Sequence, residues 1–143
     1  MFLKKKQPPI KSLIAQGSQI TGNFKFSEGL RVDGSVIGNI RASEDESSLL
    51  VISEQASVTG EMHADHIIIN GTVKGPIFAS SMLELQPKAR IEGDVHYAAL
   101  EMHQGALVAG QLRPILPNGG MGAVVGAVAG EEKPTLKLAA NNS

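Results

Sequence analysis

Apolar and polar residues alternate through the middle of the chain, from about residue 18 to residue 112. Clear examples are residues 32–36 (VDGSV) and residues 91–95 (IEGDV). A period of two places successive side chains on opposite sides of an extended chain, so the pattern predicts short β-strands with one buried face. Helical periodicity is absent. We therefore predict an all-β domain.

The alternation is organised into units that end on glycine. Three long units cover residues 50–60, 83–93 and 100–110. Two shorter units, residues 30–38 and 67–75, have Asp-Gly or Asn-Gly at a bend, and residues 20–22 form an opening half-unit. Spacings of 16, 22, 15, 18 and 17 residues separate the anchoring glycines, which are Gly22, Gly38, Gly60, Gly75, Gly93 and Gly110.

A unit of this length cannot bury its own apolar face, so neighbouring units must stack into a solenoid with about three strands per turn. Glycine on the inward side of a strand lets the chain bend sharply and keeps the interior narrow. The longest spacing contains an acidic insertion, residues 44–48 (EDESS), which we interpret as a solvated bulge because it lacks the spacing and the glycine of an EF-hand. We predict a β-helix domain at 18–112 between disordered tails at 1–17 and 113–143.

Composition narrows the possible functions. The chain has 143 residues, of which 42% are hydrophobic and 3% aromatic, and it has no cysteine. It can therefore form neither disulfides nor thiolate metal sites, which suits a reducing compartment. The net charge of −1, with no basic face evident along the sequence, argues against a nucleic-acid partner. No segment approaches the roughly 20 apolar residues of a transmembrane helix.

The succession of residues 32–40 (VDGSVIGNI), 69–77 (INGTVKGPI) and 91–95 (IEGDV) resembles the bactofilin family over residues 12–112. The resemblance implies a right-handed β-helix of about six turns whose subunits join end to end into filaments without nucleotide. It also implies a bacterial cytoskeletal scaffold, often attached to the membrane, that positions cell-wall enzymes and influences cell shape. Many members have a Phe before the Glu-Gly of the last turn, where this chain has Val108 and Ala109, so we do not carry over an aromatic end contact.

The end turns of a solenoid expose unpaired strand edges, which soluble repeat proteins normally cover with a polar cap. Here both predicted end turns are apolar. If a junction hides about 400 Å² of apolar surface, the gross gain is about 10 kcal/mol, comparable with an association cost of about 4 to 15 kcal/mol. The alternative is that these residues fill the end turns beneath folded-back tails. The predicted polymerisation interface comprises Ile20, Phe24, Phe26, Leu100, Met102, Leu107, Val108 and Leu112.

The N-terminus combines an apolar tip with three cations, and no long apolar stretch of a secretory signal follows it. An apolar tip can insert into a bilayer interface, and each cation near anionic lipid contributes about 1 kcal/mol. A filament that presents many copies gains by avidity, so we expect a cytoplasmic protein peripheral at the cytoplasmic membrane. The alternative is an inert solvated terminus. The predicted membrane-binding residues are Met1, Phe2, Leu3, Lys4, Lys5 and Lys6.

We expect no catalytic residues, no cofactor and no metal. His63, His96 and His103 fall on outward positions of different turns and His66 precedes a strand, which does not suit a zinc trio. The spacing of the repeat units does not keep the strict six-residue period of hexapeptide acyltransferases. The sequence also lacks the phosphate-binding motif G-x-x-x-x-G-K-[ST], which argues against nucleotide hydrolysis.

The expected partners are further copies of the chain and membrane lipid, together with peptidoglycan-modifying enzymes or other membrane proteins. The alternatives are a non-polymerising β-helix adaptor and, less favoured, a hexapeptide-type transferase or zinc enzyme.

Overall fold

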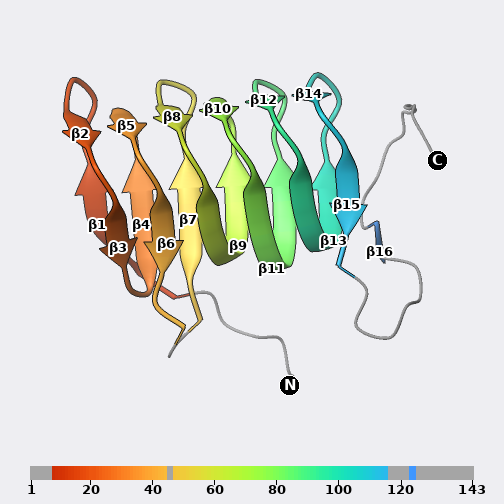
Figure 1. The fold of residues 1–143 in the computed structure, drawn as a ribbon, viewed down its shortest axis with the longest axis horizontal. Coiled ribbons are helices and arrows are strands. Elements are labelled where there is room, and N and C mark those ends of the chain that lie inside the picture. Colours follow the sequence, from red (N-terminus) through yellow and green to blue (C-terminus); the bar gives the residue numbers. More distant parts are fainter. Residues whose placement is uncertain (1–7, 45–46, 116–122, 125–143) are drawn as a thin grey trace.

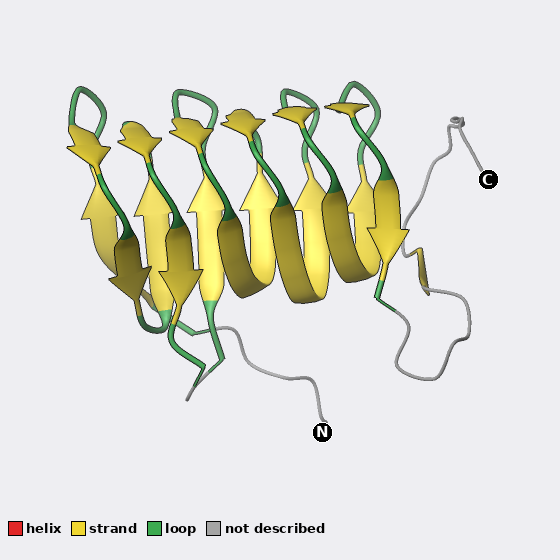
Figure 2. Ribbon diagram, in the orientation of Figure 1, coloured by secondary structure: helices red, strands yellow, loops and turns green. Residues whose placement is uncertain are grey.

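The computed structural model describes residues 8–44, 47–115 and 123–124. These residues contain strands and loops and no helix (Figure 2). The strands stack in parallel along one axis, as Figure 1 shows, and one face of the stack is a six-stranded sheet with one strand from each turn. The predicted all-β solenoid of about six turns is therefore confirmed.

The strands of the first two turns are short and separate, whereas β9, β11 and β13 bend through a corner and serve two faces of the rod. The first two turns contain β1 (Ile10–Ile14), β2 (Gln19–Thr21), β3 (Phe24–Phe26), β4 (Gly29–Val32), β5 (Ser35–Ile37) and β6 (Ile40–Ala42). The next strands are β7 (Leu49–Ile52), β8 (Ser57–Thr59), β9 (Met62–Ile69), β10 (Thr72–Lys74) and β11 (Ile77–Leu85). The last are β12 (Arg90–Glu92), β13 (Val95–Met102), β14 (Leu107–Ala109), β15 (Leu112–Pro114) and β16 (Ala123–Val124).

Three faces run along the rod. The first face contains β1, β4 and β7 and then the C-terminal halves of β9, β11 and β13. The second face contains β2, β5, β8, β10, β12 and β14 in that order. The third face contains β3 and β6, then the N-terminal halves of β9, β11 and β13, and finally β15. Every pairing is parallel, and the register shifts only between Ile10 and Ser12 of β1 and between Ala79 and Met82 of β11. Equivalent residues of successive turns therefore form columns parallel to the rod.

The core consists of the inward columns. On the second face, Val36, Val58, Val73 and Ile91 are at most 2% exposed. A corner column between the third and first faces has an aromatic residue near each end and three alanines between them, in the order Phe26, Ala42, Ala64, Ala79 and Tyr97. Val, Ile, Leu and Ala fill most of this narrow interior.

The anchoring glycines form a column at the corner between the second and third faces, with φ between +125° and +157°. At Gly60 an added Cβ would lie 2.1 Å from the carbonyl oxygen of Gly38 in the preceding turn. At the other end of the second face, the corner that contains Gly34 lies against the longer corner of the preceding turn, which contains Ser18. A Cβ there would be 2.4 Å from the carbonyl oxygen of Ser18. Glycine is therefore required both for the bend and for the close stacking of turns.

The β-helix is longer than the sequence predicted. The boundary at residue 18 is wrong, because β1 pairs with β4 and forms part of the first turn. At the other end β15 extends to Pro114, and β16 pairs with β13, so the boundary at 112 is also too early. The remaining predictions of disorder, for residues 1–7, 116–122 and 125–143, lie outside the described residues.

The acidic insertion lies between β6 and β7, and its residues 45–46 are outside the described part of the chain. Ser48, at its end, is 2% exposed. The backbone N–H of Ser48 donates to Asp65, and the backbone N–H of Asp65 donates to the Ser48 hydroxyl oxygen. The described end of the insertion is therefore tied to the rod.

Candidate assembly surfaces at the ends of the rod

The end turns have strand edges without a neighbour among the described residues. In the first turn β1 pairs only with β4, β2 only with β5, and β3 only with β6. In the last turn β14 pairs only with β12, and β15 only with β13. β16 covers part of this end by pairing at Ala99 and Leu100 of β13. Open edges present backbone N–H and C=O groups to a further strand.

The N-terminal end carries the first members of two inward columns. Ile20 pairs with Val36 and Phe24 with Ile40, and both end residues are half-buried against the core. On the outer side of this turn, Leu13 is 58% exposed. These two columns therefore begin with apolar residues at the N-terminal end, whereas Ser12, which pairs with Leu30, begins a third with a polar one.

The C-terminal end repeats this arrangement. Val108 follows Ile91 in its column, and Met102 follows Leu85. Leu112 follows Val95, which is 0% exposed, yet Leu112 itself is 41% exposed. The two residues occupy equivalent inward positions, so Leu112 is exposed because no further turn among the described residues covers it.

Three predicted interface residues differ from the expectation. Phe26 and Leu100 are only 6% and 3% exposed, so they fill the end turns of one chain and are withdrawn from the interface. Leu107 is 59% exposed, but it follows Arg90 in an outward column of the second face and therefore lies at the rim of the end.

Sequence reasoning missed exposed Ile10, Leu13 and Ile115. The first two fell in the predicted tail, and Ile115 lies just beyond the predicted domain. The alternation across residues 10–14 could have revealed β1, but a register shift between Ile10 and Ser12 interrupts it.

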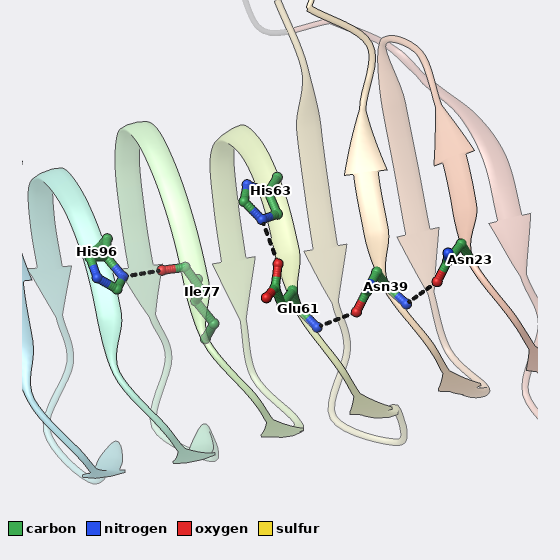
Figure 3. Close-up of polar contacts among 6 residues, drawn as sticks. All are labelled: Asn23, Asn39, Glu61, His63, Ile77 and His96. Atoms are coloured by element: carbon green, nitrogen blue, oxygen red, sulfur yellow. Dashed lines mark hydrogen bonds and ion pairs between the residues drawn. The ribbon is translucent and has the colours of Figure 1, made fainter.

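The histidines are spread over two faces. His63 and His96 project from the third face, two turns apart, as Figure 3 shows, whereas His66 lies inside β9 and does not precede a strand. Burial lowers the pKa of His66, although Glu84 and Glu101 act in the opposite direction.

His103 belongs to a separate group on the first face. Its Nε2 lies 3.4 Å from an oxygen of Glu84 and 3.2 Å from one of Glu101. When His103 is protonated, this group is an ion-pair network across two adjacent strands. One ligand atom from each residue lies within 4.8 Å of the others, and no other such group of His, Asp and Glu is found in the described ranges. The expectation of no metal stays a prediction.

Two aspartates brace neighbouring turns. The pKa of Asp94 is lowered by a hydrogen bond from the backbone N–H of Gln111 and by the Arg113 side chain. The pKa of Asp33 is lowered by the Ser53 hydroxyl, which donates to it, and by Arg31. Both carboxylates therefore hold one turn to another.

A parallel β-solenoid with apolar, incompletely covered ends is the class of protein that this geometry defines. The chain belongs to the bactofilin family, described as polymer-forming cytoskeletal, whose family model matches residues 12–113. This is a structural family and not a family of enzymes. No curated protein and no solved structure matches the chain. The described residues include no helix that is long and apolar enough to cross a membrane.

Proposed function

We propose that this protein is a cytoskeletal scaffold that assembles end to end into filaments without nucleotide and catalyses no reaction. The observation that carries the proposal is the inward column that stops at an exposed residue. Leu112 is 41% exposed, whereas Val95, one turn earlier in the same column, is 0% exposed. A second copy placed on this end would continue the column and pair with the open edges of β14 and β15.

The proposed contact comprises the exposed and half-buried members of both ends. These are Ile20 and Phe24 with their neighbours Ile10 and Leu13, and Met102, Val108, Leu112 and Ile115, with Leu107 at the rim. The residues would gain burial of apolar surface at about 25 cal/mol per Å². The backbone groups of the open edges would add hydrogen bonds worth about 1 kcal/mol each.

Electron microscopy of the purified chain without nucleotide tests assembly directly. We expect filaments from the unchanged chain and small species from Leu112→Asp and from Phe24→Asp, because each places a charge in the junction. Ile37→Asp is the matched control, because Ile37 is an apolar residue, 46% exposed, that lies on the second face one turn in from the N-terminal end and is not part of the proposed contact. Circular dichroism establishes that each variant is folded.

Filaments that persist in both end variants, or that vanish equally in Ile37→Asp, would contradict end-to-end assembly. A non-polymerising adaptor predicts a single small species for the unchanged chain. A folded, unchanged chain that stays a single copy at every concentration would favour this second candidate.

The proposed scaffold is peripheral at the inner face of the cytoplasmic membrane and positions cell-wall or cell-shape machinery there. Residues 1–6, an apolar tip followed by three lysines, support membrane attachment. Co-sedimentation with anionic vesicles should fall when residues 1–6 are deleted, while filaments persist. Unchanged co-sedimentation would refute the role of the tip.

A further inference from the structure

A straight column of basic and aromatic side chains runs along the outside of the third face. The pairing of β3, β6, β9, β11, β13 and β15 places its six members at one register position. Each member is the third residue after an anchoring glycine, so the glycine spacing fixes the column. We call it the third-face column, and its members are Lys25, Arg41, His63, Phe78, His96 and Arg113.

Three stacked rings form the centre of the third-face column. The ring centroid of Phe78 lies 4.4 Å from that of His63 and 4.3 Å from that of His96, with 12° between the ring planes in each pair. This separation is close to the strand spacing of about 4.8 Å, so the rings stack as the turns do. The column is therefore a regular feature and not a chance cluster of mobile side chains.

Two carboxylates, each on the residue directly after an anchoring glycine, pair with members of the third-face column. Glu61 Oε1 lies 3.0 Å from Nε2 of His63, as Figure 3 shows. Asp94 Oδ2 lies 3.1 Å from Nε of Arg113. These contacts offset charge in the centre and at the C-terminal end of the column.

The N-terminal half of the column has no such compensation. Lys25 and Arg41 are exposed, they are direct partners on β3 and β6, and neither forms an ion pair with any residue that the structure describes. Like charges directly opposite one another on adjacent strands are unfavourable. Lys25 and Arg41 are thus two adjacent cations without a carboxylate partner in the described part of the rod.

We propose that the third face lies against an anionic lipid surface, with Lys25 and Arg41 as its main electrostatic contacts and Phe78 at the interface. This inference deepens the proposed membrane attachment. A column with one member per turn along a single sheet face suits an extended planar partner. Only three residues separate Lys6 from Ile10, so chain connectivity keeps Lys6 within about 14 Å of the first turn, which also carries Lys25.

The aromatic and apolar features favour a bilayer over a nucleic acid. Interfacial segments combine basic residues with apolar and aromatic ones, as the third-face column and the tip at residues 1–3 do. Duplex binding instead depends on many phosphate contacts from a broad basic surface, and this chain has a net charge of −1.

The test is co-sedimentation of the full chain with vesicles of phosphatidylglycerol and phosphatidylcholine. Each basic residue near an anionic surface changes partitioning about five-fold, so we expect Lys25→Glu/Arg41→Glu to lower binding by roughly 25-fold or more. The matched control is Lys74→Glu/Lys88→Glu, the same charge reversal on β10 and in the corner between β11 and β12, with an expected change under about two-fold. Electron microscopy must show that both variants still form the same assemblies.

Binding that is unchanged in Lys25→Glu/Arg41→Glu, or lowered equally in the control pair, would overturn the inference. So would equal binding to pure phosphatidylcholine vesicles, or tighter binding of the column to duplex DNA than to anionic vesicles. Deleting residues 1–6 separates the two membrane proposals. If deleting residues 1–6 abolishes binding and Lys25→Glu/Arg41→Glu does not lower it, the tip is the attachment and the third-face proposal is refuted. If only Lys25→Glu/Arg41→Glu lowers binding, the third face is the attachment and the role of the tip is refuted.

Discussion

Replacing Gly60 with alanine tests whether close stacking of the turns requires glycine. Gly60 has φ +141° and lies in the middle of the glycine column. Its added Cβ would lie 2.1 Å from the carbonyl oxygen and 2.6 Å from the carbonyl carbon of Gly38. Both neighbours are backbone atoms, which cannot rotate away as a side chain can. The whole turn must therefore shift.

Gly22 is the matched control, because it begins the same column. Its φ is +125°, but an added Cβ would meet no atom within 4 Å. Both alanine variants incur the backbone strain of a positive φ, about 1 to 3 kcal/mol. Only Gly60→Ala adds the overpacking cost, about 1 to 3 kcal/mol or more. We therefore expect Gly60→Ala to lose about 2 to 6 kcal/mol in total and Gly22→Ala at most about half of that.

Urea unfolding followed by circular dichroism measures this difference, at a dilution where sedimentation shows single copies. A protein of this size is stable by about 5 to 15 kcal/mol, so Gly60→Ala should lower the midpoint substantially or unfold the chain. Equal midpoints for the two variants would refute the idea that stacking, beyond the backbone angle, requires glycine. A stable Gly22→Ala variant that no longer forms filaments would place Gly22 at the junction.

The other predictions concern the core and the ion pairs. Ile67 is 0% exposed, so Ile67→Ala should lower the free energy of unfolding in urea by about 2 to 5 kcal/mol. Its neighbour Ile68 is half-buried and points outward, so Ile68→Ala should lower the free energy of unfolding much less. Equal losses would contradict the assignment of inward and outward positions. The pKa of Asp94 lies below the ordinary value of 3.8, because the N–H of Gln111 and the side chain of Arg113 favour the charged form. A lowered carboxyl pKa stabilises the fold above the ordinary value, and this contribution is lost as pH falls through the folded value. Asp94→Asn should therefore be less stable than the unchanged chain at neutral pH, with a gap that closes in acid, and a gap that widens in acid would refute this assignment.

The repeat could be predicted from the sequence because two independent signals agree. Alternation assigned the inward positions, and the glycines marked the bends. The residues two before each anchor, such as Val36, Val58 and Val73, are buried as this reading requires. Local pattern and global stacking are consistent throughout this part of the chain.

The extent of the first turn was missed, although part of its signal was present. Gly22 follows Ile14 by eight residues, as Gly60 follows Ile52, but β1 itself comes directly after Pro8 and Pro9. Its register shift also breaks the period of two. Pairing with β4 stabilises this strand, and that tertiary contact leaves little trace in the local sequence.

The third-face column was also missed, although its signal was present. A net charge of −1 averages over the whole chain and hides where cations gather. Lys25 and Arg41 are 16 residues apart in sequence and become neighbours only when the turns are placed in register. Aligning the third residue after each anchoring glycine would have revealed the column.

The corner column that contains Tyr97 provides an intrinsic optical probe. The chain has one tyrosine and no tryptophan, so its near-ultraviolet emission comes from this one residue. Tyr97 is 3% exposed, pairs with Pro114 of β15, and has a pKa raised by burial. Its fluorescence and its resistance to ionisation in alkali therefore report on packing beneath the C-terminal end, without any added label.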